Sequence, residues 1–255
     1  MISLACGGTL AASDTSLLLS FPSPRPALST ALWGGGFRTV RWALNQKLTG
    51  YWPRPQDFPG GSPAAFLRQS LEAQGAAPEE SCAFLTSARM DRFRHVVKRA
   101  AGLTVEIAAT GGVEKTAARA GDPPLYREED GRFFPTGTIN LIVLVSASLP
   151  PYAMVRAVLT LTEGKTAALQ DLGIASAITG RPATGTATDG LILLTDPDAP
   201  ELTDAGTFSL LGSLLADAAH EAVTRCLSDF SLPWNAFDAL RTPPAADLTG
   251  KKPRR

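Results

Sequence analysis

GTINLIVLVSASLP (137–150), PYAMVRAVLTLTEGKTAALQDLGI (151–174) and TGRPATGTATDG (179–190) lie close together in the chain. The first stretch is apolar and rich in β-branched residues, which predicts a buried strand. The second repeats its apolar residues at helical spacing, and the third is rich in threonine and glycine, which predicts a loop. Another apolar run follows at Leu191. The order is therefore strand, helix, loop and strand, and elements set so closely can meet at one pocket.

Lys165 lies inside the apolar stripe of the predicted helix. An ammonium group removed from water must be paired, neutralised or directed at a ligand, because an isolated buried charge is too costly to keep. The alternative is that the long stem of Lys165 carries its ammonium past the stripe to solvent. The stripe follows the four-and-three spacing of one helix face and consists of Met154, Val158, Leu161, Lys165, Ala168 and Leu172.

The composition excludes several classes of partner. Lysine and arginine number 24, as do aspartate and glutamate, so the charge indicates neither nucleic acid nor an anionic membrane surface. The start, MISLACGGTL, lacks the basic and apolar regions of a signal peptide, and no apolar run reaches the roughly 18 residues of a membrane span. We therefore expect a cytoplasmic protein that binds a small molecule. The sequence leaves a homo-oligomer open.

The cysteines and histidines favour neither a disulfide framework nor a metal site. Cys6, Cys82 and Cys226 are far apart and show no CxxC spacing, so we expect them to be buried apolar residues. His95 and His220 are the only histidines, too few for a histidine-based metal cluster. We expect no metal bound by the protein and no cofactor.

The order of strands and helices predicts an α/β (mixed α+β) fold, a single domain in which helices cover a mixed sheet. We place this domain at residues 1–240 and a disordered basic tail at 241–255. The predicted strands are Leu17–Phe21 and Ala27–Trp33 around a proline-rich turn, Cys82–Ser87, Phe93–Lys98 and Thr104–Thr110, and the other predicted helices are Phe37–Leu48, Pro63–Gln74 and Phe208–Leu227.

Two segments outside the central stretch are candidates for ligand contact. Gly34 to Gly36 form a glycine-rich junction, and Gly35 can present its N–H to a ligand at the start of the helix predicted there. A tight turn without a ligand is the alternative. The loop 51–62 has aromatic residues that can either cover a ligand as a lid or anchor the loop to the domain.

The motif EGKT (163–166) does not form a phosphate-binding loop, because Leu159 stands where the first glycine would be required. No G-x-S-x-G elbow is present either. Polar candidates remain on the helix, on the threonine loop and at strand ends. The loop threonines alternate, so in an extended segment their hydroxyls point the same way, or else they satisfy local backbone groups. The candidates are Glu163, Lys165, Thr166, Thr184, Thr186, Thr188, Asp189, Thr110, Thr138 and Asn140.

Four segments resemble, in order, the motifs of the adenosylcobinamide amidohydrolase family of corrinoid salvage, and the resemblance covers roughly Leu28 to Val223. The segments are TAARAGD (116–122), GTINLIVLV (137–145), TEGKTAALQDLGI (162–174) and TGTATDGLIL (184–193). The resemblance implies hydrolysis of the amide between the aminopropanol arm and the corrin ring of adenosylcobinamide, giving adenosylcobyric acid for cobalamin assembly. The corrin brings its own cobalt, so a protein without metal ligands is compatible with it.

Under this hypothesis Glu163 or Asp189 activates the nucleophile and Lys165 supplies charge or a proton. Glu163 and Lys165 diverge by about 160° on an ideal helix, so Lys165 is favoured. A threonine hydroxyl acting as nucleophile beside Lys165 is a variant mechanism. The alternative function is a corrinoid-binding protein that stores or senses its ligand. Substrate binding is assigned to Thr110, Asn140, Thr166, Thr184, Thr186, Thr188 and Gly35.

The sequence departs from the family pattern at four positions. Trp33 and Lys115 stand where asparagine is usual, and both changes bear on the substrate range. Gly164 replaces a usual alanine inside the predicted helix, which costs about 1 kcal/mol but permits closer packing. Ala187 replaces a usual glycine in the threonine loop.

Overall fold

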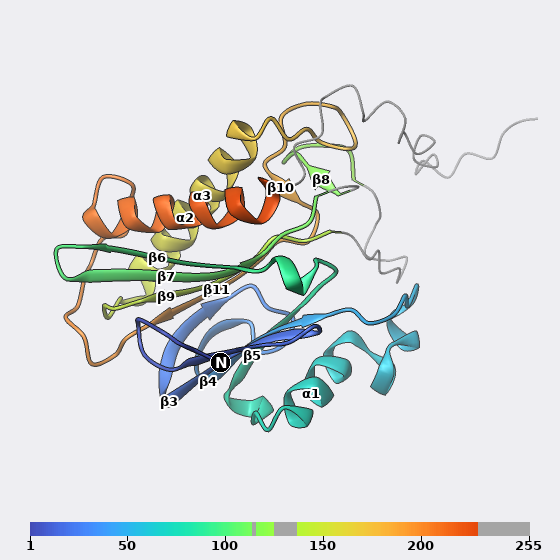
Figure 1. The fold of residues 1–255 in the computed structure, drawn as a ribbon, viewed down its shortest axis with the longest axis horizontal. Coiled ribbons are helices and arrows are strands. Elements are labelled where there is room, and N and C mark those ends of the chain that lie inside the picture. Colours follow the sequence, from blue (N-terminus) through green and yellow to red (C-terminus); the bar gives the residue numbers. More distant parts are fainter. Residues whose placement is uncertain (114–115, 125–136, 229–255) are drawn as a thin grey trace, which may run out of the picture.

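The structure is a computed structural model that describes residues 1–113, 116–124 and 137–228. Figure 1 shows a curled β-sheet with helices on both of its outer faces. Helices α2 (Pro151–Asp171) and α3 (Leu210–Leu227) cover one face, and α1 (Pro63–Ala73) covers the other. The predicted α/β (mixed α+β) fold, a single domain with a mixed sheet covered by helices, is confirmed. Lys115 and the tail predicted at 241–255 lie outside the described residues, and the boundary at residue 240 stays a prediction.

The half of the sheet beneath α2 and α3 has the order β11-β9-β7-β6. Strand β9 (Asn140–Val145) is parallel to β11 (Gly190–Thr195) and antiparallel to β7 (Leu103–Thr110), which pairs in turn with β6 (Arg94–Ala100). Because parallel neighbours need a long crossover, α2 and the threonine loop connect β9 to β11. The strands and helices predicted for these stretches are confirmed, with ends that differ by a few residues.

One long strand, β3 (Ser16–Ser29), joins the two halves of the sheet. Its first half pairs with β2 (Thr9–Ala12) and its second half with β11. The register shifts between Ser20 and Arg25, within a stretch whose prolines lack the N–H that a regular ladder needs. The prediction of two strands around a turn is therefore wrong, because the prolines bend a single strand without ending it.

Strand β4 (Gly36–Lys47) occupies the stretch where a helix was predicted, and that prediction is wrong. It pairs antiparallel with β3 and parallel with β5 (Ser81–Thr86). Phe37, Val40 and Leu44 do recur at helical spacing, but Phe37 is exposed while Val40 and Leu44 pack in two different cores. A strand covered on both faces has no single apolar stripe, and short apolar patterns of this kind are ambiguous.

Several short elements complete the fold. Strand β1 (Ile2–Ser3) pairs with β2, and neither was predicted. Strand β8 (Ala117–Ala118) pairs with β10 (Gly185–Thr186) in a separate two-stranded sheet at the end of the molecule where α2 finishes. Single turns of 3₁₀-helix lie at Pro55–Asp57, Pro59–Gly61, Pro78–Glu80 and Met90–Arg92.

Strand side chains alternate between two large cores. Leu141, Val143 and Val145 of β9 pack beneath α2 and α3, whereas Ile142 and Leu144 pack between the two layers of the sheet. A smaller core lies between α1 and the strands β4 and β5. This alternation decides which face of the sheet each candidate site residue occupies.

The loop 51–62 is anchored to α1 by its aromatic residues. Phe58 is buried, and the Trp52 ring lies 4.8 Å from the Phe58 ring and 5.4 Å from the Phe66 ring, centroid to centroid. These contacts give two of the aromatics an anchoring role, which favours the alternative to a lid.

All three cysteines are free and buried, as predicted. Burial raises the pKa of the Cys6 and Cys226 thiols to about 12 and that of Cys82 to about 11. The thiols therefore stay protonated at neutral pH and are poor nucleophiles.

In the described part of the chain, no helix is long and apolar enough to cross a bilayer.

Gly164 sits where α2 crosses α3. A Cβ added there would lie 2.5 Å from the carbonyl oxygen of Ala216 and 3.0 Å from its Cα, and backbone cannot rotate away as a side chain can. We expect Gly164→Ala to lower the free energy of unfolding by about 1–3 kcal/mol, despite the better helix propensity of alanine. Chemical denaturation followed by circular dichroism measures this. Equal or greater stability in the variant would contradict the close approach.

Glu106 anchors the start of the chain from inside the sheet. Its fully buried carboxylate accepts hydrogen bonds from the backbone N–H groups of Ala5 (3.0 Å) and Cys6 (2.8 Å), and it lies 2.6 Å from His95 Nε2. Nearby, Arg25 donates to the carbonyl of Cys6. Burial raises the pKa of Glu106, but the hydrogen bonds from His95 and the two backbone groups outweigh it, so the pKa lies below its ordinary value.

A carboxyl group with a lowered pKa stabilises the folded state above its ordinary pKa of 4.5, and this contribution is lost as the pH falls through the folded value. We expect the free energy of unfolding of the natural protein to fall in this acid range. Glu106→Gln should cost about 3 kcal/mol at pH 7 and should flatten that acid dependence. Denaturant titrations of both proteins from pH 7 downward measure it, and parallel pH profiles would refute the role of Glu106.

Candidate active site

The Lys165 ammonium forms an ion pair and hydrogen bond with the Asp189 carboxylate. Their side chains are 12% and 18% exposed, so neither reaches bulk solvent freely. Lys165 comes from the middle of α2, and Asp189 ends the threonine loop immediately before β11. The pair is therefore largely removed from water, and Coulomb interactions are stronger there than at an exposed surface.

Asp189 is held by three further donors. Its Oδ1 atom accepts hydrogen bonds from the Thr186 hydroxyl at 2.5 Å, the Thr186 N–H at 3.1 Å and the Ile139 N–H at 3.2 Å. This geometry fixes the carboxylate between a hydroxyl and an ammonium. A hydroxyl beside a base, with a cation beside that base, is an arrangement that can support acyl transfer.

Gly185 lies directly against the Lys165–Asp189 pair. A Cβ at this position would lie 2.3 Å from Asp189 Oδ2 and 2.7 Å from Lys165 Nζ. Gly185 belongs to β10, whose pairing with β8 fixes its backbone. The strand therefore passes directly against the pair, and a side chain at this position would displace Asp189 or Lys165.

The other candidate threonine hydroxyls either bond backbone groups of neighbouring segments or lie near the surface. The Thr166 hydroxyl donates to the carbonyl of Thr184 at 3.1 Å, which ties α2 to the loop. The Thr184 hydroxyl accepts from the N–H of Ala120 at 2.9 Å. The hydroxyls of Thr138 and Thr188 lie 2.5 Å apart, and Thr188 is exposed. The hydroxyls of Thr166 and Thr184 thus bond backbone groups of other segments and hold the scaffold together.

Asp122 was not predicted as a site residue, yet it joins the segment after β8 to the loop that follows α2. It accepts hydrogen bonds from the Ser176 hydroxyl (2.5 Å), the Thr179 hydroxyl (2.7 Å) and the Arg119 N–H (2.8 Å). Burial raises the pKa of this carboxyl, but the hydrogen bonds from Ser176 and Arg119 outweigh it, so the pKa is lowered. The segment TAARAGD was the signal that could have identified it.

Glu163 is not brought together with Lys165. It lies on the exposed face of α2, as the divergence of the two residues on a helix implied. The predicted role of Glu163 in activating the nucleophile consequently gains no geometric support, whereas the same role for Asp189 does.

Thr110 and Asn140 lie on the opposite face of the sheet from Lys165, so the structure does not bring them together with the Lys165–Asp189 pair. Both are buried between the two layers of the sheet. Asn140 donates to Asn45 Oδ1 (3.0 Å) and to the carbonyl of Leu85 (2.9 Å), and Asn45 donates to the Thr110 hydroxyl (2.8 Å). The sequence could not show which face of the sheet Thr110 and Asn140 occupy, because Thr110 is the last residue of β7 and Asn140 is the first residue of β9.

Gly35 lies in the turn between β3 and β4. A Cβ there would lie 2.4 Å from the carbonyl of Ala31, so a tight turn requires glycine, which favours the alternative without a ligand. Trp33, in the same turn, donates to the carbonyl of Pro78 at 2.8 Å and is held against β5.

Within the described ranges, no group of three or more histidine, cysteine or acidic residues is arranged to hold a metal ion.

The family model described as adenosylcobinamide amidohydrolase matches residues 5–231. The chain belongs to this family, and its class is that of an amidohydrolase. A curated relative, the uncharacterized protein MJ1613 of Methanocaldococcus jannaschii, is 28% identical over 228 residues, which is 83% of this chain and 85% of the relative. Family membership confirms the resemblance seen in the sequence motifs.

Three solved structures share a distant likeness. The PH0078 protein of Pyrococcus horikoshii OT3 aligns with a TM-score of 0.44 and 11% identity over 92% of this chain and 86% of its own. The L-aminopeptidase D-Ala-esterase/amidase of Ochrobactrum anthropi gives 0.41 and 10% over 89% and 85%. A Burkholderia sp. beta-aminopeptidase gives 0.40 and 15% over 86% and 81%.

Proposed function

We propose that the protein hydrolyses the amide that joins the aminopropanol arm to the corrin ring of adenosylcobinamide. The products are adenosylcobyric acid and free aminopropanol, and the reaction serves corrinoid salvage in the cytoplasm. The observation that carries this proposal is the family match over residues 5–231. The Lys165, Asp189 and Thr186 constellation supplies groups that amide hydrolysis needs.

Thr186 is the nucleophile of the proposed reaction. Its hydroxyl is within 2.5 Å of Asp189 Oδ1, so the proton can pass to the carboxylate as the oxygen attacks the amide carbon. The new bond joins Thr186 Oγ1 to the carbonyl carbon. The bond that breaks joins this carbon to the nitrogen of aminopropanol.

Lys165 provides the proton for the leaving nitrogen. An ammonium has three donors, and within the described residues Asp189 takes one of them. The proton that Asp189 received from Thr186 then returns Lys165 to its charged form across their hydrogen bond. Water hydrolyses the resulting threonine ester, giving the carboxylic acid and restoring the Thr186 hydroxyl. The sum is one amide and one water converted to one acid and one amine.

The proposed mechanism predicts a difference between two substitutions of Thr186. Thr186→Ser keeps a hydroxyl at the same position and should retain activity within about tenfold, whereas Thr186→Ala should lose about a hundredfold or more. Initial rates of aminopropanol release measure both. Full activity in Thr186→Ala would transfer the nucleophile to a water molecule activated by Asp189.

The function itself is tested by incubating the purified full chain with adenosylcobinamide. Mass spectrometry of the corrinoid and of the small products should show adenosylcobyric acid and aminopropanol accumulating together. The rival function, a protein that only stores or senses a corrinoid, predicts retention of intact adenosylcobinamide. Bound but unchanged substrate after prolonged incubation would therefore overturn the proposal.

A further inference from the structure

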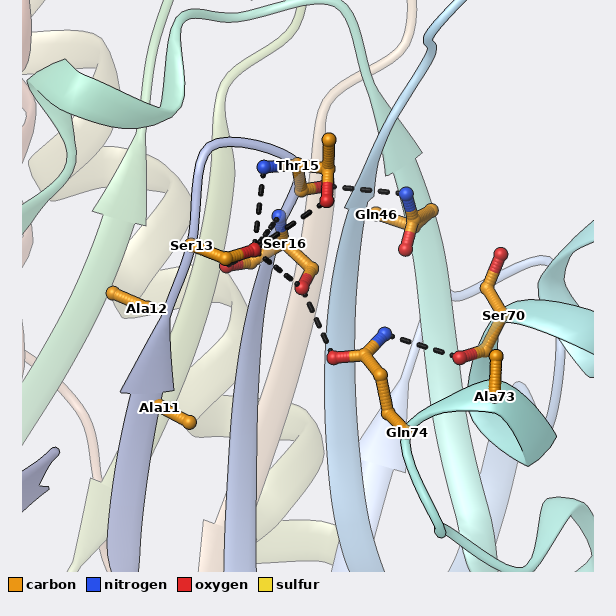
Figure 2. Close-up of a pocket in the computed structure, with 9 residues that line it drawn as sticks. All are labelled: Ala11, Ala12, Ser13, Thr15, Ser16, Gln46, Ser70, Ala73 and Gln74. Carbon is orange, nitrogen blue, oxygen red and sulfur yellow. Dashed lines mark hydrogen bonds between the residues drawn. The ribbon is translucent and has the colours of Figure 1, made fainter.

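A cavity of about 400 Å³ lies between the β2–β3 turn, strand β4 and the end of α1 (Figure 2). It lies beside the layer of the sheet that α1 covers, and no residue of the proposed catalytic constellation lines it. Its size falls within the range of small-molecule sites. Its lining carries hydroxyl and carboxamide groups together with the methyl groups of the exposed residues Ala11, Ala12 and Ala73.

Gln46 presents a fixed hydrogen-bond acceptor to this cavity. The residue is only 6% exposed. Its Nε2 atom donates to the carbonyls of Thr15 and Lys47, both at 3.1 Å. Both partners are acceptors, so the carboxamide cannot be flipped, and its oxygen is the atom left facing the cavity. Across the described residues this oxygen has no hydrogen-bond partner, and Figure 2 shows it pointing from β4 toward α1.

Gln74 presents a donor from the opposite wall. Its Oε1 atom accepts from the Ser16 hydroxyl at 3.0 Å, and one hydrogen of its Nε2 atom is donated to the carbonyl of Ser70 at 3.0 Å. An amide nitrogen carries two hydrogens, so the second one is available to a ligand. The cavity thus offers an acceptor on one side and a donor on the other.

We propose that this cavity binds a small uncharged ligand through a primary carboxamide. The ligand amide donates to Gln46 Oε1 and accepts from Gln74 Nε2, while its apolar body contacts the alanine methyl groups of the lining. The lining has no charged side chain, so a carboxylate or ammonium ligand would lose hydration without gaining a counter-charge. The site is independent of the proposed hydrolysis, and failure of either proposal leaves the other standing.

The test is a titration of the full ¹⁵N-labelled chain followed by its backbone amide resonances. Benzamide is the probe, benzoate is its charged analogue, and methyl benzoate keeps the acceptor but lacks the donor. Benzamide should give saturable shifts confined to the cavity walls, with binding at least about tenfold tighter than either analogue. Shifts scattered over the surface, or equal binding of methyl benzoate, would overturn the proposal.

Two variants test the assigned atoms. Gln74→Met removes the donor at an exposed position and should weaken benzamide binding by about three- to tenfold. Gln46→Met removes the acceptor and should weaken it at least as much, provided that the resonance pattern shows a folded protein. The matched control is Gln69→Met, which makes the same change on α1 outside the cavity and should leave binding unchanged. Benzamide binding that is unaltered in Gln74→Met would refute the assignment even if Gln46→Met does not fold.

Discussion

Lys165→Met should abolish the release of aminopropanol from adenosylcobinamide, with a loss of about a thousandfold or more in rate, while the protein stays folded. Methionine has a similar length and flexibility, so it can fill the same space on α2. It removes the cation that faces Asp189 and the proton that the leaving nitrogen needs. Rates come from quantifying aminopropanol, and circular dichroism reports the folded state.

The matched control for this experiment is Lys98→Met. Lys98 also forms ion pairs, with Asp217 and Glu221, but they lie between β6 and α3 and away from the threonine loop. This variant should keep its rate within about twofold, because partly exposed ion pairs contribute little. Unchanged turnover in Lys165→Met would remove Lys165 from the mechanism, and equal losses in both variants would indicate a general effect of lost ion pairs.

Gly185→Ala should reduce the rate by about a hundredfold through steric displacement of the catalytic pair. The added methyl group would lie 2.3 Å from Asp189 Oδ2 and 2.7 Å from Lys165 Nζ, both far inside contact distance. One of the two side chains must move, and even a displacement of about 1 Å can cost a hundredfold in rate. Because neither displaced group is backbone, the fold should persist with a modest loss of stability.

Ala187→Gly is the control in the same loop. Ala187 is exposed, and the substitution changes the chain by the same single methyl group. We expect a rate within a few-fold of the natural protein. A fully active Gly185→Ala enzyme would show that the close approach of β10 to the Lys165–Asp189 pair is unimportant for catalysis.

The parts of the fold that the sequence predicted well have one clear periodicity. Helix α2 has a single buried stripe, and the strands β7 and β9 are short, apolar runs bounded by glycine or polar residues. The prediction for β4 was wrong because two different cores cover this strand, which leaves a pattern that resembles helical spacing. The prediction for β3 was wrong because prolines normally end a strand. Only the pairing with β4 shows that this strand continues past them.

The candidate site was predictable where helix geometry applies. The position of Lys165 in the stripe of α2 predicted an inward ammonium that needs a partner, and the structure provides Asp189. The faces of strand-end residues were not predictable, because one residue decides whether a side chain points toward α2 or between the layers. The sequence assigned Asn140 and Thr110 to the substrate as polar residues at strand ends, and the structure places them with Asn45 between the two layers of the sheet.

The most direct measurement of the central claim is the mass of the corrinoid product formed in water enriched in oxygen-18. If the Lys165, Asp189 and Thr186 constellation hydrolyses the amide, adenosylcobyric acid should carry the heavy oxygen in its new carboxyl group and should appear with an equal amount of aminopropanol. The Lys165→Met protein should yield neither. Adenosylcobinamide recovered intact from the natural protein, or labelled acid formed equally well by Lys165→Met, would contradict the account.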